Sequence, residues 1–534
     1  MVNNKYILVI LGMLTLFSCD DDMGNYNYSD INEVSLSNFE SGRLYEKVAY
    51  VDRLDFDPQI VSTQNKNDDG SYEYQWKLIP QGKDFREIED TTALTISRER
   101  KLDQLVTMKP GLYSGFFIVT DKDSGVSWTT PFQLRVRSIT SEGWMILCDD
   151  NGKSRMDIIF NSTETEDLIA HDIWKENSFN PGKPSHLIFN YRYNVGGAAS
   201  MLVTDKNTYL LDVIDLHAGE DNEIKWQFGA SPEKVLVKAA GMSQYAIDNN
   251  WTLIDQNDDI YMMSLNTYGS LFEFPINKID GKEPFKPSPF VGVSYDSGYD
   301  TGYGCAPTML YDATHRQFLV IRNNASYPSV MTFEKDKLFS AQTGRDMVYL
   351  ENTKPGTIFS LLKDPNNGDV YFYGIRMRAE YTEGAYWWEE GTYTEFNTQE
   401  YYGKVQGEGI DKATKYAIHH LYPYIFYVYN NTVYQFDMGH PDETAKPILS
   451  FPGEEIVVLK VNPFVAWEAY STWERQRGNH LVIGTIDKSK GDSECGIMRA
   501  YDVPNLMEPL TMVKEYRGLG KIVDIAYKER SVTR

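Results

Sequence analysis

The chain has 534 residues, of which 42% are apolar and 13% aromatic, and its 52 basic and 76 acidic side chains give a net charge of −24. This apolar content supports a folded core, so the composition excludes a disordered or collagen-like chain. The aromatic content favours sheets over helices. Strong acidity disfavours a phosphate backbone as a ligand, so no nucleic acid partner is expected.

Residues 1–18, MVNNKYILVILGMLTLFS, are typical of a signal peptide. Lys5 supplies the positive start, and an uncharged run of 12 residues follows from Tyr6 to Phe17, shorter than the roughly 20 that a spanning helix needs. The stretch LFSC, which ends at Cys19, resembles a bacterial lipobox. That resemblance implies cleavage before Cys19 and lipid attachment to its thiol, which would hold the chain at a membrane. The alternative is a coincidental cysteine after an ordinary signal peptide.

Residues 19–35 form an acidic tether. Asp20, Asp21 and Asp22 directly follow Cys19, and they resemble the export signal of surface lipoproteins in Bacteroidetes. The resemblance implies an outer-membrane location, lipid-anchored and exposed at the cell surface. A merely soluble tether is the alternative.

Residues 36–138 have the pattern of an all-β domain. Residues 73–78 alternate in burial preference, and residues 111–121 and 127–136 form two further strands around a turn at 122–125. A tryptophan, Trp76, opposite a Gly-x-Tyr strand is typical of an Ig-like β-sandwich, here without the disulfide between its sheets.

Three stretches of this region carry a family resemblance: CDDDMGNYNY from Cys19, YQWKL from Tyr74 and GLYSGFFIVTDKDSGVSW from Gly111. In order and spacing they resemble the PKD-like family of Bacteroidetes lipoproteins, over roughly residues 19–138. The resemblance implies a PKD/Ig-like sandwich. It also implies a role in nutrient uptake, because such lipoproteins accompany outer-membrane importers of the SusC/SusD type.

Residues 139–534 contain a repeated hairpin. Each copy has an apolar strand, a turn rich in Asp, Asn or Gly, and a second strand, and the copies start at positions 143, 201, 253, 308, 360, 423 and 480. A four-stranded propeller blade needs about 40 to 50 residues, so we predict a β-propeller of seven blades. Six or eight blades, or a β-sandwich array, are the alternatives.

The last strand is predicted to close this ring. Residues 454–460, EEIVVLK, precede the last hairpin as an inner strand, and residues 521–528, KIVDIAYK, repeat the pattern with no hairpin after them. We expect 521–528 to supply the missing inner strand of the blade that begins at Trp144, which removes two exposed sheet edges.

Motifs for cofactor or metal chemistry are not found in the sequence. There is no Gly-x-Ser-x-Gly, Walker A or HExxH motif, and Cys148, Cys305 and Cys495 predict a buried free thiol rather than a zinc site. His419 and His420 would point to opposite faces of a strand and could not share a metal. The acidic turns 255–259 and 364–369 are interpreted as Asx turns. No cofactor and no metal are therefore predicted.

Aromatic residues gather in predicted loops between strands, where flat rings can stack on sugars or bind peptides. Tyr401 and Tyr402 are placed in another such segment, and packing between blades is the competing explanation. The predicted ligand-binding residues are Tyr295, Tyr299, Tyr303, Tyr386, Trp387, Trp388, Trp467 and Trp473.

These features predict a non-catalytic accessory lipoprotein that binds glycan or peptide for a SusC/SusD-type uptake system. One alternative is a surface-anchored propeller hydrolase, which would need two carboxyl groups roughly 5 to 10 Å apart. Another is a structural subunit of the transporter complex that meets no nutrient itself.

Overall fold

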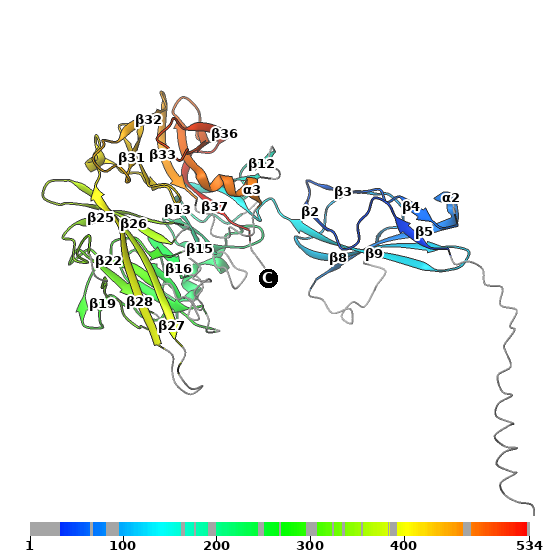
Figure 1. Ribbon diagram of the computed structural model, residues 1–534, viewed down its shortest axis with the longest axis horizontal. Helices are drawn as coiled ribbons and strands as arrows, with labels where there is room; N and C mark the ends of the chain where they lie inside the picture. Colours follow the sequence, from blue (N-terminus) through cyan, green and yellow to red (C-terminus); the bar gives the residue numbers. More distant parts are fainter. Residues whose placement is uncertain are drawn as a thin grey trace, which may run out of the picture. The chain divides into compact units, whose positions relative to one another are not determined.

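The structure is a computed structural model in which nearly all regular elements are β-strands. The chain divides into unit 1, Met1–Val136, and unit 2, Arg137–Arg534 (Figure 1). Among the described residues, no helix is long and apolar enough to cross a membrane. The described residues are 32–64, 68–81, 95–161, 166–175, 178–190, 199–243, 250–265, 267, 269–294, 307–322, 325–333, 337–353, 356–382, 384, 392–462 and 471–530.

Unit 1 is a β-sandwich with an aromatic core, as the sequence predicts. Its main sheet has the order β2-β9-β8-β5-β6, and the pairs β1-β4 and β3-β7 complete it. Trp76 is fully buried, packs on Phe117 with ring centroids 4.3 Å apart, and donates from Nε1 to the Glu99 carbonyl at 3.0 Å. The elements are β1 (Val34–Leu36), β2 (Leu44–Val48), β3 (Arg53–Phe56), β4 (Ile60–Ser62), α2 (Asp68–Ser71), β5 (Tyr72–Pro80), β6 (Thr95–Ser97), β7 (Leu102–Leu105), β8 (Gly111–Asp121) and β9 (Ser127–Arg137).

Unit 2 is a β-propeller, and its sheets are numbered here by the order of their second strands. Sheet 1 contains β37 (Ile522–Lys528), β10 (Gly143–Asp150), β11 (Lys153–Asn161) and β12 (Asp167–Ala170). Sheet 2 contains β13 (Pro184–Asn190), β14 (Ala199–Thr204) and β15 (Thr208–Leu211), and sheet 3 contains β16 (Ala239–Met242), β17 (Asn250–Ile254) and β18 (Ile260–Ser264). Sheet 4 contains β21 (Gly292–Val293), β22 (Thr308–Asp312), β23 (Gln317–Ile321) and β24 (Ser329–Val330).

The remaining sheets of unit 2 have four strands each. Sheet 5 contains β25 (Asp346–Asn352), β26 (Thr357–Lys363), β27 (Val370–Thr382) and β28 (Thr392–Lys404). Sheet 6 contains β29 (Tyr416–Ile418), β30 (Tyr424–Tyr429), β31 (Thr432–Asp437) and β32 (Lys446–Ser450). Sheet 7 contains β33 (Glu454–Val461), β34 (His480–Asp487), β35 (Gly496–Asp502) and β36 (Thr511–Leu519).

Short elements lie in the connections between and within these sheets. They are η3 (Glu220–Asn222), η4 (Ile224–Gln227), the pair β19 (Lys278–Ile279) and β20 (Glu283–Pro284), η6 (Ile410–Lys412), α3 (Thr472–Arg475) and η8 (Gln476–Asn479).

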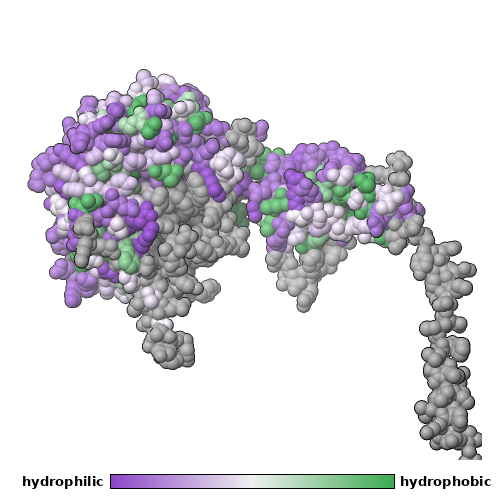
Figure 2. All heavy atoms as spheres, viewed as in Figure 1, coloured by the Kyte–Doolittle hydropathy of each residue, from purple (hydrophilic) through white to green (hydrophobic). Residues whose placement is uncertain are grey.

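Each predicted hairpin forms the second and third strands of one sheet, so the repeat pattern is confirmed at the level of strands. The innermost strands of successive sheets lie side by side, from β37 through β13, β16, β21, β25 and β29 to β33, and β33 lies beside β37 again. Central strands such as β22 and β23 are apolar and buried because sheets cover both of their faces. On the face shown in Figure 2, hydrophilic residues cover most of the coloured surface, in keeping with the acidic composition.

The closing strand is observed where the sequence predicts it. Strand β37 pairs antiparallel with β10, with Tyr527 opposite Trp144. Cys148 of this sheet and Cys495 are buried free thiols, as expected for at least one cysteine, whereas Cys305 lies outside the described residues. Burial raises the pKa of the Cys148 thiol well above its usual value, so it is a packing group.

Strand direction defines two faces of the propeller. Because neighbouring strands of each sheet are antiparallel, the loops from first to second strand and from third to fourth strand leave at the same edge. We call the side of unit 2 that carries these loops the pocket face. The tight hairpin turns between second and third strands lie on the opposite side.

Candidate functional site

Most of the predicted ligand-binding residues cannot be placed. Trp473 is described and lies in the short helix α3, between β33 and β34. The others lie outside the described residues, as does the predicted lipid anchor: Tyr295, Tyr299, Tyr303, Tyr386, Trp387, Trp388, Trp467, Cys19, Asp20, Asp21 and Asp22.

The strand ends that flank these loops share one face. Segment 295–306 joins the first and second strands of sheet 4, segment 385–391 joins the third and fourth strands of sheet 5, and segment 463–470 joins the first and second strands of sheet 7. All three connections therefore start and end on the pocket face. Tyr401 and Tyr402 are different, because they lie inside strand β28, so their prediction as loop residues is wrong.

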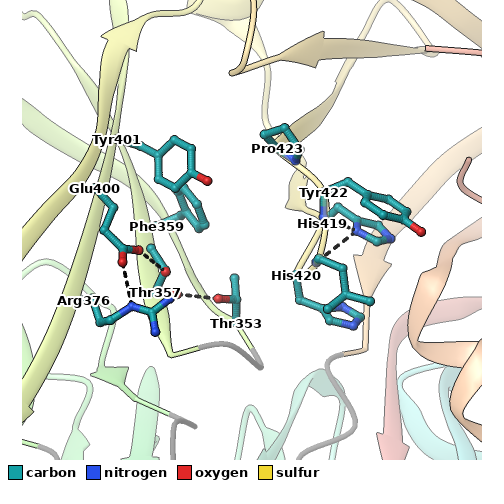
Figure 3. Close-up of a pocket in the computed structure, with 11 residues that line it drawn as sticks. Thr353, Thr357, Phe359, Arg376, Glu400, Tyr401, His419, His420, Tyr422 and Pro423 are labelled. Atoms are coloured by element: carbon teal, nitrogen blue, oxygen red, sulfur yellow. Dashed lines mark hydrogen bonds and ion pairs between the residues drawn. The ribbon is translucent and has the colours of Figure 1, made fainter. Parts of the chain in front are cut away.

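A cavity of about 550 Å³, which we call pocket A, lies on the pocket face between sheets 5 and 6. One wall carries Phe359, Arg376, Glu400 and Tyr401 from β26, β27 and β28. The other wall is the loop from His419 to Pro423, between β29 and β30. In Figure 3 the two groups of side chains face each other across the open space.

The sheet 5 wall of pocket A joins an ion pair to an aromatic surface. Arg376 Nε lies 2.7 Å from Glu400 Oε1, and the Thr357 hydroxyl donates to Glu400 Oε2 at 2.5 Å. The Tyr401 ring packs on Phe359 with centroids 5.2 Å apart. The wall offers hydrogen-bonding groups beside a flat ring, a combination that suits sugars and peptides.

The sequence pattern does not predict that the side chains of this wall meet. Arg376 and Glu400 are far apart in the chain, and only the pairing of β27 with β28, which sets Arg376 opposite Thr398, brings them together. The signal in the sequence is the strand segment TYTEFNTQEYYGK. In a regular strand the adjacent residues Glu400 and Tyr401 would point to opposite faces of the sheet, whereas here both line pocket A. A register shift between Gly374 and Ile375 accompanies this pattern.

The sheet 6 wall is a stack of rings. His419 lies parallel to Tyr422 with centroids 4.7 Å apart and parallel to His420 at 5.2 Å. Both histidines follow the end of β29, so the predicted placement on opposite faces of a strand is wrong. Because the two histidines lie in a turn, their side chains do not follow the alternation of a strand.

His419 is held as a neutral ring. Its Nδ1 accepts the backbone N–H groups of Leu421 and Tyr422, at 3.2 and 3.0 Å. Nε2 therefore carries the proton and donates to the Asn479 carbonyl at 3.3 Å. Burial lowers the pKa of His419 to about 4. This ring shapes the pocket wall and does not exchange protons near neutral pH.

A second cavity of about 230 Å³, pocket B, lies on the same face between sheets 7 and 1. Trp473 belongs to its lining, together with Trp144, Asp167, Arg477, His480 and Lys514. The Arg477 guanidinium stands over the Trp473 ring, 4.5 Å from its centroid. Burial, followed by the charge of Arg477, lowers the pKa of His480 to about 4.

Charged groups also lie on the inner strands. Lys460 of β33 pairs with Asp524 of β37 at 2.6 Å, and Asp524 Oδ2 also accepts the Leu187 N–H at 2.9 Å. Burial raises the pKa of Glu351 on β25 to about 7, and the Tyr349 hydroxyl, which donates to this carboxyl group, and Lys460 oppose the rise. Both acids are thus tied to internal partners.

The acidic turns are Asx turns, as predicted. Asp364 Oδ1 accepts the Asn366 N–H at 2.9 Å, and Asp255 Oδ1 accepts the N–H groups of Asn257 and Asp259 at 2.8 and 2.9 Å. Among the described residues, no group of three His, Cys, Asp or Glu side chains is arranged to hold a metal ion.

Comparison with protein families identifies the first part of the chain. Residues 19–180 match a model of the PKD-like family, and the match covers the region of the predicted resemblance and extends past β10, β11 and β12. Among curated proteins, no match to the chain is found.

Several solved structures resemble the chain weakly. A quinonprotein alcohol dehydrogenase-like protein from Bacteroides thetaiotaomicron aligns over 93% of this chain and 99% of its own, at 11% identity and a TM-score of 0.40. A protein from Lactobacillus plantarum aligns over 73% and 100%, at 9% identity and 0.39. The SapL1 lectin, solved with alpha methyl fucoside, aligns over 64% and 96%, at 11% identity and 0.30. Likeness at this level carries no conclusion about what this chain binds.

The buried neutral His419 predicts acid sensitivity. Because its folded pKa is about 4 against an ordinary value of 6.5, the unfolded chain binds the proton more tightly, so stability is lost as pH falls from about 6.5 toward 4. We expect this residue to contribute roughly 2 to 3 kcal/mol to that loss. In thermal unfolding from pH 7.5 to 4.5, His419→Gln should show a shallower decline than the unaltered protein.

His440 provides a control of opposite sign. It is exposed, and its hydrogen bond from Nδ1 to Asp437 raises its pKa, so its stabilising effect is present at low pH and is lost as pH rises. His440→Gln should therefore not reduce the acid-induced loss. An unchanged pH profile in His419→Gln would contradict the neutral-ring assignment.

Proposed function

We propose that this protein is a surface-exposed outer-membrane lipoprotein that captures a glycan or peptide for a SusC/SusD-type nutrient uptake system, without catalysing a reaction on it. Unit 1 acts as a spacer or docking module, and unit 2 provides the ligand-binding surface. A lipid on Cys19 confines the binder near the transporter, which raises the local concentration of captured ligand.

Pocket A is the observation that carries the binding role. Its volume of about 550 Å³ falls within the range of roughly 300 to 1,000 Å³ typical of small-molecule sites. Tyr401 offers a ring face, and the Arg376–Glu400 pair, each side chain a quarter exposed, offers donors and acceptors beside it. These groups can orient a polar ligand while the ring covers its apolar face.

The pairing of charged groups favours binding over hydrolysis. Glu400 is held by Arg376 and Thr357, and both nitrogen atoms of His419 are engaged. The raised pKa of Glu351 is the observation that favours a hydrolase, because a general acid works with a pKa near 7. The other inner-strand acid described above, Asp524, is held by Lys460 and the Leu187 N–H, which leaves it poorly suited to act as a nucleophile or base.

The aromatic loops extend the proposed site. The connections at 295–306, 385–391 and 463–470 leave from the pocket face. We retain the predicted aromatic residues of these loops as proposed ligand contacts, and Trp473, which is described, lines pocket B. The structural-subunit alternative needs a broad apolar surface, and on the face shown in Figure 2 the coloured residues form only small hydrophobic patches.

Replacement of Tyr401 tests the site. Retention on immobilised oligosaccharide and peptide arrays should fall at least about tenfold in Tyr401→Ala, because a stacking ring at the centre of a site carries much of the binding energy. Arg376→Gln should have a similar effect. Tyr402→Ala is the matched control, since Tyr402 is the next residue of β28 and packs with Phe339 and Tyr373 instead. Equal retention by the Tyr401→Ala and Tyr402→Ala variants would remove pocket A from the proposal.

Replacement of Cys19 tests the anchor. In Cys19→Ala, the protein should leave the membrane fraction, because the uncleaved or unacylated chain lacks the lipid that holds the mature form. Metabolic labelling with palmitate should mark the unaltered protein and not the variant. Cys305→Ala, a change at a cysteine far from the lipobox, serves as the control. Labelling that persists in Cys19→Ala would overturn the lipobox assignment.

A further inference from the structure

Pocket B holds a buried positive charge that no acid of the described chain neutralises. Arg477 is 8% exposed, and its guanidinium lies against the Trp473 ring and donates to the Tyr527 hydroxyl at 3.1 Å. Among the described residues, no carboxylate forms an ion pair with it. A charge removed from water in this way is costly unless an anion compensates it.

Glu142 and Glu474 lie within two residues of the lining residues Trp144 and Trp473, and both are held by other arginines. Glu142 pairs with Arg530 at 2.6 Å and with Arg137 at 2.7 Å, and Glu474 also pairs with Arg530. Two arginines thus hold both carboxylates, and among the described residues neither acid forms an ion pair with Arg477. In a chain with a net charge of −24, this uncompensated guanidinium distinguishes pocket B.

The other charged groups of pocket B cancel each other. Lys514 lies 2.7 Å from Asp167 Oδ2, which also accepts the Tyr516 hydroxyl at 2.9 Å. His480 stays neutral above a pH of about 4. Near neutral pH the pocket therefore presents the single net positive charge of Arg477.

The shape of pocket B favours a single ring that bears an anionic group to pair with Arg477. Trp473 and Trp144 supply flat apolar surface, and such faces stack on sugar rings. The cavity of about 230 Å³ is smaller than the roughly 300 Å³ at which typical ligand sites begin, so it accommodates one ring and not a chain. A planar guanidinium binds a carboxylate through two parallel hydrogen bonds.

One hydrogen bond links the lining of pocket A to the chain beside pocket B. His419 lines pocket A, and its Nε2–H donates to the carbonyl of Asn479. Asn479 directly precedes His480, which lines pocket B. A glycan that follows this link across the pocket face can place one of its units in each pocket.

We propose that pocket B is a subsite for a carboxylate-bearing sugar unit, such as a uronate, of a glycan of which another unit occupies pocket A. This inference rests on the proposed binding function and narrows its ligand to acidic glycans. Arg477 binds the carboxylate, Trp473 stacks on the ring, and Lys514 with Asp167 provides hydrogen bonds at the rim.

Matched pairs of oligosaccharides test the subsite. The probes are glucuronate- and glucose-containing, galacturonate- and galactose-containing, and sialylated and desialylated oligosaccharides, measured on an array and by calorimetry with the full chain. The unaltered protein should bind at least one acidic member about tenfold or more tightly than its neutral mate. Raising salt from about 0.05 to about 0.5 M should weaken only the acidic member.

Variants of Arg477 assign this preference to pocket B. Arg477→Gln should abolish the preference for acidic members, while Arg477→Lys, which keeps the charge but loses the planar fork, should retain part of this preference. Arg517→Gln, an exposed arginine of β36, is the control. Near-ultraviolet circular dichroism verifies the fold, and Arg477→Lys decides the result if Arg477→Gln does not fold.

The outcomes separate this inference from the proposed function. Equal binding of acidic and neutral members, or an acidic preference that survives in both Arg477 variants, overturns the subsite. If neutral glycans bind and Tyr401→Ala abolishes their binding, the binding function stands and only the subsite fails. Preferential binding of acidic peptides over all glycans also overturns the inference.

Discussion

The pairing of β37 with β10 is the interaction on which unit 2 depends, because it joins the end of the chain to the first predicted hairpin. Buried polar groups fix this closure. Lys528 Nζ donates to the carbonyls of Thr140, Ser141 and Val213 at 2.8 to 2.9 Å, and burial lowers its pKa to about 8. Asp524 connects β37 to β33 through Lys460 and to β13 through the Leu187 N–H. Without β37, sheet 1 would expose an inner edge and leave these groups without partners.

Closure also determines where the pockets form. In a ring of sheets, side chains fill the space between neighbouring blades, and only the loop ends leave room for a ligand. Pocket A opens at the loops of sheets 5 and 6, and pocket B opens where sheet 7 meets the closing sheet 1. Trp144, Tyr516 and Trp473 come together at pocket B because the last strand completes the first blade. The ring closure therefore supports a site as well as a fold.

The fold could be predicted from the sequence because each hairpin has its own local pattern of apolar strands and a polar turn. Apolar strands such as MILC and FLVI flank turns rich in Asp, Asn or Gly, and the structure places all seven such hairpins as second and third strands of a sheet. The residues that line the two pockets were harder to predict. Arg376 meets Glu400 only through strand pairing, and Arg477 is informative only because Glu142 and Glu474 are held elsewhere. Such long-range relations have no local pattern. The sequence predicts Tyr401 as a loop residue, because its strand departs from simple alternation.

Hydrogen–deuterium exchange tests the central claim, that the last strand closes the ring and thereby holds the pocket face. Two chains are compared, one ending at Gly520, which lacks β37, and one ending at Arg530, which retains it. The account predicts that only the shorter chain loses protection in β10 and β13 and in the pocket A segment 419–423, since these depend on the completed ring. Protection retained in all three segments of the shorter chain would contradict the account.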